Sequence, residues 1–427
     1  MLETLHLKNV GPAKEMKLEF APRLNVITGD NGLGKSFILD CAWFGLSLTW
    51  SQEIDANLLS GGMVRPIKNE PTLISVSYLL QNETSMQQFE FFHQKQNWFN
   101  TTQQSALESL RNLPRIDMPY QGIVIQCHIG GGFSIWDSAR HFQTKSHQPE
   151  VFTETTVWKG SQDFPEGLIR DLASWQRENG KVLKQFQVVL ECLSPSQSEQ
   201  LKLGELTRVR IEDRKDTPTI QMPYGESIPI TQASSGIRRI IAFAYILVWA
   251  WREHLLVSNL LKQEPQKQLT FLIDEIESHL HPKWQQVIVK ALLNVAKALS
   301  DELEVQIILT THSPLVLQSL ETVFDSDKDA WFDLDFDPIK KEVVLEKRDY
   351  FKRGSLNNWI TSEAFDLPSS YTQEAKAVMD EVSNALKGEL TLEQAQKLNA
   401  ELQDVLGDID IFWSRWHSAL ERRGLVL

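Results

Sequence analysis

Cysteine is scarce in this chain, whose 427 residues include three: Cys41, Cys127 and Cys192. These cysteines stand far apart in apolar contexts, so they offer neither a disulfide framework nor the close spacing of a metal site. Scarce cysteine without such patterns is typical of proteins from a reducing compartment. We therefore expect a cytoplasmic protein.

Membrane and targeting segments are also lacking. The N-terminus has the pattern of a strand and carries no basic segment followed by an apolar one. The longest apolar run, 240–251, is too short to cross a bilayer. We find no internal repeat and no sustained heptad pattern, which excludes a repeat array and a long coiled-coil arm. These absences predict a globular protein with no membrane partner.

The charge balance is acidic, with 56 Asp and Glu against 43 Lys and Arg and a net charge of −13. This balance argues against a surface that binds nucleic acid everywhere, although a local basic stripe is compatible with it. The hydrophobic share of 42% is ordinary for a globular protein. The length allows two or three domains, or one elaborated core.

What the sequence does contain is a phosphate-binding loop. Residues 29–36 read Gly-Asp-Asn-Gly-Leu-Gly-Lys-Ser and fit the pattern G-x-x-x-x-G-K-[ST]. The apolar run 24–28 precedes the loop as a buried strand, and 37–44 follow it as the start of an apolar helix. Glycines there let backbone N–H groups approach phosphate oxygens, and the helix N-terminus adds partial positive charge.

This loop predicts a site for ATP and Mg²⁺. Lys35 is expected to reach the β- and γ-phosphates, where it would act in catalysis, and the Ser36 hydroxyl is expected to ligate Mg²⁺. The predicted nucleotide contacts lie in the loop and the first helical residues: Asn31, Gly32, Gly34, Lys35, Ser36 and Phe37.

Two adjacent acids follow a second apolar strand. Residues 270–273 have the composition of a fully buried strand and lead into Asp274 and Glu275. Phosphoryl transfer requires one acid in the Mg²⁺ shell and one beside the attacking water. We therefore predict Asp274 as a metal ligand and Glu275 as the catalytic general base. Glu277 is left without a role, as a surface charge.

A serine-glycine turn opens the long apolar helix predicted over about 236–256. Ser234, Ser235 and Gly236 combine hydroxyl groups, backbone N–H groups and a helix N-terminus, which together suit an anion. The turn is therefore a second predicted nucleotide contact. An ordinary helix N-cap is the alternative interpretation.

Two histidine-containing loops complete the pattern. In 278–282, His279 and His281 have a spacing compatible with a metal, but no third ligand stands nearby, so we interpret the loop as an interface contact. His312 follows the apolar strand 305–310 and is placed to sense a γ-phosphate by hydrogen bond. A purely structural histidine is the alternative.

Apolar strands and helices alternate over 236–310, which is typical of a doubly wound α/β sheet. The aromatic segment 133–137 is predicted to pack in the core rather than to stack on a base.

In the tail, Thr391 and Gln394 form a capping box, and an apolar stripe is expected to pack on the body: Ile409, Phe412, Trp413 and Trp416. Other expected strands are 73–80, 88–92, 123–129, 204–212 and 218–222, with helical spacing over 165–203 and 282–299 and a loop or short helix over 94–113.

Taken in order, these motifs resemble those of ABC-type ATPases of the SMC and RecF kind. More narrowly, they resemble the OLD-like ATPases of bacterial phage-defence operons, such as the ATPase subunits of Septu and retron-associated systems. Residues 277–282 supply the Glu-x-His-Leu-His-Pro that commonly follows the acids in such proteins. The resemblance covers roughly 1–50 and 225–365. It implies a P-loop NTPase of ABC or SMC-head type, with a mixed sheet, a β-rich lobe, a helical lobe and extra C-terminal helices.

The resemblance also implies a head-to-tail homodimer, or a higher oligomer, with two ATP molecules at the interface. The Ser235–Gly236 turn of one subunit would contact the γ-phosphate held by Lys35 of the other. Residues 278–281 would form the D-loop, and His312 would be the switch histidine. Two candidates remain open for the glutamine loop of the family, Gln126 and Gln162.

The chain departs from the family pattern in two ways. No coiled coil separates its halves, and the tail beyond about 365 is too short for the metal-binding TOPRIM nuclease domain of full OLD proteins. We expect four parts: an N-terminal ATPase lobe with the Walker A loop and a β-rich insertion (1–160), a helical signature lobe (161–267), the C-terminal part of the core with the Walker B acids (268–365), and a helical tail (366–427).

The preferred functional hypothesis is a Mg²⁺-dependent ATPase that dimerises around ATP and controls a separate effector, a nuclease or toxin, in anti-phage defence. A DNA-repair ATPase that binds DNA directly is one alternative, and a nucleotide-sensing scaffold with negligible turnover is another. DNA or RNA is a possible partner in either case. A membrane-transporter cassette fits worst, because the signature lacks the usual Leu-Ser-Gly-Gly-Gln form.

Overall fold

A computed structural model of the protein describes residues 1–66, 70–80, 83–102, 120–141, 148–161, 166–212, 215–365, 367 and 369–425. The chain divides into two compact units, Met1–Gly354 and Ser355–Leu427, and each is described by itself.

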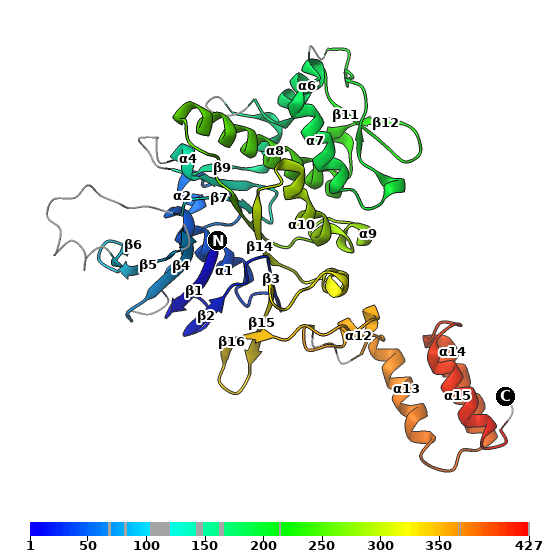
Figure 1. The fold of residues 1–427 in the computed structure, drawn as a ribbon. Coiled ribbons are helices and arrows are strands. Elements are labelled where there is room, and N and C mark those ends of the chain that lie inside the picture. The colour runs from blue at the N-terminus through cyan, green and yellow to red at the C-terminus, as the bar shows by residue number, and fades with distance from the viewer. Residues whose placement is uncertain are drawn as a thin grey trace. The chain divides into compact units, whose positions relative to one another are not determined.

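A mixed eight-stranded sheet forms the centre of the first unit (Figure 1). In order across the sheet, its strands are β16 (Glu342–Arg348), β15 (Asp329–Asp337), β3 (Leu24–Gly29), β14 (Glu304–Thr310), β13 (Gln268–Ile273), β7 (Ile123–Cys127), β8 (Phe133–Asp137) and β9 (Glu150–Phe152). The five strands from β15 to β7 are parallel, and β16, β8 and β9 pair antiparallel to their neighbours. Parallel strands place their carboxyl ends at one edge of the sheet, where α/β proteins bind ligands.

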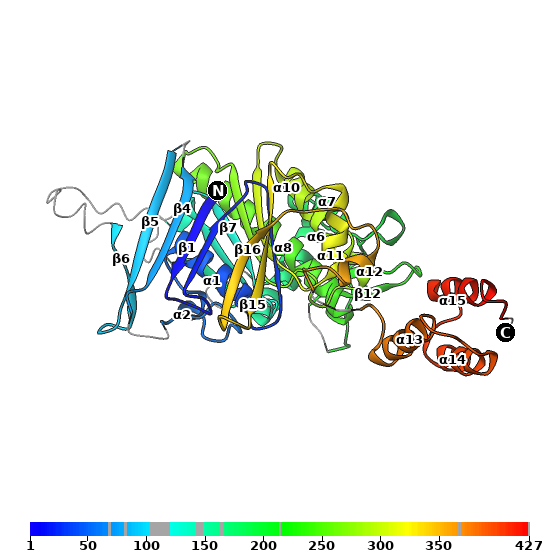
Figure 2. The ribbon, with the colours of Figure 1, turned by 90° about the horizontal axis from the view of Figure 1, so that it is seen from below.

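A second, antiparallel sheet makes the β-rich lobe. Helix α1 (Lys35–Ser47) contacts strands of both sheets and lies between them (Figure 2). Its side chains are apolar nearly all round, as expected for a helix covered on two faces. The strands of this sheet are, in order, β2 (Glu15–Glu19), β1 (Leu2–Lys8), β4 (Leu73–Leu80), β5 (Glu83–Phe92) and β6 (Asn97–Asn100).

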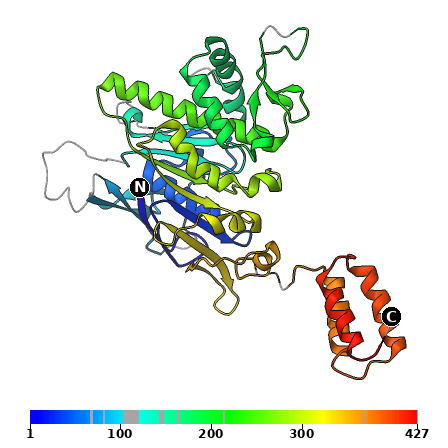
Figure 3. The ribbon, with the colours of Figure 1, turned by 45° about the vertical axis from the view of Figure 1, so that its right-hand side comes forward.

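Helices cover the other face of the large sheet (Figure 3). The longest is α8 (Ser235–Leu261), which packs against α7 (Lys181–Cys192). Among the described residues, α8 is the one helix long and apolar enough to span a membrane, but 72% of its most apolar window is buried inside the protein. This burial makes it a core helix. The other helices here include α5 (Glu154–Lys159), α6 (Leu168–Glu178), α9 (Pro282–Gln285), α10 (Ile288–Leu299) and α11 (Pro314–Ser319), beside a small sheet of β10 (Lys202–Leu203), β11 (Thr219–Gln221) and β12 (Ser227–Pro229).

Most expected elements are present, but three expectations are wrong. The predicted strand 204–212 forms only an isolated bridge at Thr207, because there is no core beneath it and Ile211 is fully exposed. The predicted helix 282–299 breaks at 286–287, between α9 and α10. Within α9, the Trp284 indole donates to the Leu193 carbonyl oxygen at 3.0 Å. The expected loop 94–113 contains β6, and its part from 103 lies outside the described residues.

The hairpin of β15 and β16 is absent from the predictions because acids alternate along β15. Two of those acids are nevertheless buried and paired. Asp329 forms an ion pair with Arg23, and Asp333 accepts a hydrogen bond from the Thr28 hydroxyl at 2.7 Å. Their partners stand some 300 residues earlier in the chain, so no local pattern reveals them.

The second unit has a core of its own. The capping box at Thr391 is present, and Trp416 is fully buried in that core, against which Phe412 and Trp413 pack. The predicted stripe thus packs largely within this unit, while Ile409 is 99% exposed. The helices of this unit are α12 (Leu356–Ile360), α13 (Gln373–Ala385), α14 (Leu392–Val405) and α15 (Ile411–Glu421).

Close packing of α1 on β4 makes a testable prediction. A Cβ added at Gly45 would lie 2.3 Å from Val76 Cγ1. Although alanine is the better helix former by about 1 kcal/mol, overpacking should dominate, so Gly45→Ala should lower the free energy of unfolding by about 1–3 kcal/mol. Urea unfolding measures this change. Gly180→Ala, where an added Cβ has nothing within 4 Å, is the control, and equal effects of the two substitutions would contradict the packing argument.

Candidate nucleotide site

The phosphate-binding loop joins β3 to α1 and is built on left-handed glycines. Gly29, Gly32 and Gly34 have φ values of 132°, 81° and 105°. A Cβ at Gly29 would lie 2.3 Å from the Leu334 carbonyl oxygen, and one at Gly34 would lie 2.8 Å from Pro12 Cγ, whereas nothing lies within 4 Å of Gly32. The loop is therefore packed from behind and open at Gly32, which leaves room for a phosphate.

Lys35 is buried at the start of α1. Its ammonium donates hydrogen bonds to the carbonyl oxygens of Gly29 and Asp30, both at 2.8 Å. Burial lowers the pKa of Lys35, and the nearby carboxylates of Glu275 and Asp274 oppose that shift. The side chain is thus held inside the loop that it is predicted to serve.

Ser36 and Asp274 meet as the sequence predicts. The Ser36 hydroxyl donates to Asp274 Oδ1 at 3.0 Å, and the Thr310 hydroxyl donates to the same oxygen at 2.8 Å. Asp274 is 3% exposed and stands directly after β13. Hydroxyl and carboxylate oxygens are the ligands that Mg²⁺ prefers, so this pair fits the ion.

Glu275 and His312 lie on the same edge of the sheet. Glu275 has a φ of 45°, and its backbone N–H donates to the Thr310 hydroxyl at 2.7 Å. Its Oε1 is 3.7 Å from His312 Nε2. Burial and the neighbouring Asp274 raise the pKa of Glu275, whereas burial and Lys35 lower the pKa of His312. These shifts favour a neutral histidine beside a carboxylate of increased basicity.

Glu277 is the residue that the sequence analysis missed. Its Oε2 accepts from the Thr311 hydroxyl at 2.7 Å, and its Oε1 accepts from the His312 backbone N–H at 2.5 Å. It therefore fixes the backbone that carries His312. A signal was available, because the strands before Glu277 and before His312 are both apolar and a parallel sheet brings such strand ends together.

The serine-glycine turn begins α8. Ser234 is the N-cap, with its hydroxyl accepting from the Ile237 N–H at 3.4 Å, and the exposed Ser235 follows it. A Cβ at Gly236 would lie 2.6 Å from the His279 carbonyl oxygen, so glycine lets the helix start pack on the 278–281 loop. Ser234 thus caps the helix, and Ser235 remains exposed to solvent.

Two of the remaining candidate residues, Phe37 and Gln126, contact other residues of the protein. The Phe37 ring packs behind Gly11, where an added Cβ would lie 2.4 Å from the ring. Gln126 is buried in β7 and donates to Asp40 Oδ1 at 2.8 Å, while burial raises the pKa of Asp40 to about 7. Gln162 lies outside the described residues. In the described part of the chain, no group of three metal-ligating side chains includes His279 or His281.

A buried histidine beside this site makes stability depend on pH. His128 follows β7, and its ring nitrogens contact the hydroxyls of Ser60 at 2.9 Å and Ser134 at 2.8 Å. Burial lowers its pKa to about 4. Because the unfolded chain binds the proton near pH 6.5, this residue should cost up to about 3 kcal/mol of stability as the pH falls from 6.5 to 4.

Chemical denaturation of His128→Gln at several pH values tests this prediction. The variant should lose stability less steeply between pH 6.5 and 4 than the parent protein. His281→Gln, at an exposed position, should keep the parental slope. Parallel pH profiles for His128→Gln and the parent would contradict the assignment.

Two proteins of similar sequence are both named as probable ATPases of retrons. The Retron Vc95 probable ATPase of Vibrio cholerae serotype O1 biovar El Tor is 34% identical over 119 residues, which are 28% of this chain and 21% of that protein. The Retron Ec83 probable ATPase of Escherichia coli is 27% identical over 262 residues, which are 60% of this chain and 43% of that protein. The matches thus span less than half the length of either relative.

Among solved structures, an SMC head bound to the C-terminal winged-helix domain of ScpA has a TM-score of 0.46 and 15% identity, over 82% of this chain and 98% of that one. The SMC head domain from Thermotoga maritima has a TM-score of 0.40 and 14% identity, over 82% and 99% of the two chains.

The sequence profile of the AAA ATPase domain family matches residues 49–317, which is more than half of the chain. The matched segment contains Asp274 and Glu275, the serine-glycine turn and His312, and the predicted phosphate-binding loop lies just before it. Within the fold described above, that loop contacts the matched segment directly through Ser36 and Asp274. The chain has a P-loop fold and belongs to the AAA ATPase domain family.

Proposed function

We propose that the protein hydrolyses ATP with Mg²⁺ between two copies of the chain, and that this cycle controls a separate effector, a nuclease or toxin, in bacterial anti-phage defence. The observation that carries the proposal is the contact of Ser36 with Asp274 at 3.0 Å, beside Glu275 and His312. It brings the predicted phosphate loop, a hydroxyl–carboxylate oxygen pair suited to Mg²⁺ and the proposed general base to one edge of the sheet.

Each residue has a part in hydrolysis. Lys35 would exchange its two carbonyl partners for phosphate oxygens, and Asn31, Gly32 and Gly34 would bring backbone N–H groups to them. Ser36 and Asp274 would hold Mg²⁺, which supplies positive charge to the phosphates. Glu275 would accept a proton from the attacking water, and His312 would donate a hydrogen bond to the γ-phosphate.

The dimer is supported by the exposure of the serine-glycine turn. Ser234 and Ser235 are exposed at the N-terminus of a 27-residue helix, and Gly236 packs on the loop that follows the Walker B acids. A helix N-terminus with two hydroxyls suits an anion. In a head-to-tail pair, this turn would contact the γ-phosphate bound to the Lys35 of the partner.

The biological setting rests on the named relatives. Two of the matched proteins are named as probable ATPases of retrons. We therefore assign nucleolytic or toxic activity to a separate partner, in the cytoplasm, with DNA or RNA as a candidate trigger. Purification with neighbouring gene products, followed by identification of what co-elutes, tests this assignment.

Replacement of the general base tests hydrolysis and dimerisation together. Glu275→Gln should lower the rate of phosphate release at least 100-fold, since general-base catalysis is worth about 10²–10⁴. Because the trapped ATP remains bound, sedimentation velocity should show an ATP-dependent dimer. Lys35→Ala is the control that should lose both hydrolysis and dimerisation. Parental turnover in Glu275→Gln would refute the catalytic assignment, and an unchanged monomer would refute the composite site.

A second prediction concerns Glu277, which positions the backbone that carries His312. Glu277→Ala removes both hydrogen bonds to Thr311 and His312, each worth about 1.5–3 kcal/mol for a charged acceptor. Since the loop that carries His312 loosens, kcat should fall about 10–100-fold, whereas the Kd for ATP should change less than threefold.

Glu277→Gln, which retains one acceptor oxygen, should keep an intermediate kcat. Glu264→Gln, in the exposed loop before β13, serves as the control for a general loss of charge. A parental kcat in Glu277→Ala, or a kcat loss that merely follows weaker ATP binding, would show that Glu277 does not position the histidine.

A further inference from the structure

A cavity of about 340 Å³ lies between the start of α8 and the loop after β13, and the exposed Ser235 is among its lining residues. Its walls come from the segment after β7, from α5, from the first turns of α8, from the loop after β13 and from α10. Cavities of this volume are at the lower end of the range that holds small ligands. It is separate from the phosphate-binding loop, because no residue of 29–36 lines it.

The walls are mainly apolar and aromatic, including Phe133, Trp158 and Phe243. Two arginines of α8 also line the cavity, and Arg239 is already engaged, donating to the carbonyl oxygens of Ile129 at 3.1 Å and Asp274 at 3.2 Å. Those contacts are structural links between α8 and the strand ends. The chemistry of a ligand must therefore suit the other arginine, Arg238.

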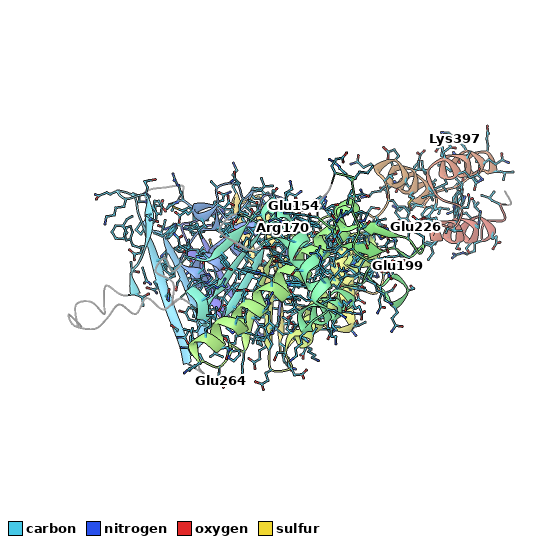
Figure 4. The ribbon with its side chains drawn as sticks, turned by 90° about the horizontal axis from the view of Figure 1, so that it is seen from above. Glu154, Arg170, Glu199, Glu226, Glu264 and Lys397 are labelled. Atoms are coloured by element: carbon cyan, nitrogen blue, oxygen red, sulfur yellow. The ribbon has the colours of Figure 1, made fainter. Side chains whose placement is uncertain are left out.

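Arg238 has a buried donor without a partner in the part of the chain that the structure describes. One of its terminal nitrogens donates to Glu154 at 2.6 Å, and its guanidinium lies 5.2 Å from the centre of the Trp158 ring. Figure 4 labels Glu154, at the start of α5. The Nε of Arg238 is buried and has no hydrogen-bond partner among the described residues. A buried N–H without a partner is costly, and an acceptor brought by a ligand would satisfy it.

We propose that this cavity binds a flat, largely apolar small molecule that carries one anionic or acceptor group. Aromatic walls and the stacked Arg238–Trp158 pair favour a ring system, and Arg238 Nε favours a carboxylate, sulfonate or carbonyl oxygen. The cavity thus selects an aromatic acid or a similar ring compound with a single polar edge.

Such a ligand acts on the ATPase through the turn that forms one wall. Ile276, His279 and Leu280 line the cavity and belong to the same turn as Glu275 and Glu277. Glu275 and His279 both have positive φ, at 45° and 63°, which is uncommon for residues other than glycine. Filling the cavity against this turn changes the position of Glu275 and hence the rate of hydrolysis.

Anilinonaphthalene sulfonate, an aromatic anion that fluoresces in apolar surroundings, is the probe. With the full chain and no nucleotide, its fluorescence should rise saturably with one molecule bound per chain. Arg238→Gln should weaken binding at least tenfold. Ala242→Leu, which fills the cavity from α8, should weaken it at least as much. If Ala242→Leu does not fold, Leu292→Phe narrows the cavity from α10.

Leu260→Gln is the control for binding to exposed apolar surface, because Leu260 is 81% exposed at the end of α8. It should bind the probe as the parent does. Equal binding by the parent, Arg238→Gln and Ala242→Leu, absence of saturable binding, or loss of binding in Leu260→Gln would each overturn the site.

A turnover assay tests the coupling. Saturating probe should change the ATP turnover of the parent at least twofold and leave the turnover of Ala242→Leu unaffected, and an unchanged parental rate would overturn the coupling. The binding experiment needs neither ATP nor a dimer. Failure of the proposed ATP-driven dimerisation would therefore leave the cavity site standing, and failure of probe binding would leave the dimer standing.

Discussion

The structure of the site depends on the hydrogen bond between Ser36 and Asp274. It joins residues 238 positions apart and brings together the two strand ends that bear the phosphate loop and the acids. Asp274 is almost fully buried, so its carboxylate requires partners there. The hydroxyls of Ser36 and Thr310 provide them at 3.0 and 2.8 Å. Because strand β14 lies between β3 and β13, Thr310 stands between these two ends and links them.

The side chains of the other predicted site residues lie next to that contact, along the same edge of the sheet. The Thr310 hydroxyl also accepts from the Glu275 backbone N–H, while Glu277 holds the backbone of His312. Arg239 extends the same set of contacts to α8, since it donates to the carbonyl oxygen of Asp274. The start of α8, with its exposed serines, is thereby linked to the backbone of Asp274. A movement of the start of α8 would therefore shift the backbone of Asp274, and a movement of Asp274 would shift the start of α8.

The sequence was sufficient to predict those parts of the fold and of the site that depend on local patterns of residues. The loop 29–36, the acids after β13 and His312 each stand at the end of an apolar strand, and parallel pairing then determines that they meet. The apolar strands before Glu277 and His312 were a signal that these strand ends lie at one edge of the sheet. They did not show that β13 and β14 are neighbours, and the hydrogen bonds of Glu277 depend on that pairing. The β15–β16 hairpin was missed since the partners of Asp329 and Asp333 lie near the N-terminus. The strand predicted over 204–212 failed because alternation without a core to cover does not make a sheet.

Cross-linking tests most directly whether two copies complete one nucleotide site. Asp30→Cys on the phosphate loop and Ser234→Cys on the turn before α8 are exposed positions, and Cys192→Ser removes the one native cysteine that is not buried. In the Glu275→Gln background, a short bismaleimide should yield a covalent dimer that requires both cysteines together with ATP and Mg²⁺. A chain that stays monomeric at saturating ATP, or that cross-links equally without it, would contradict the account.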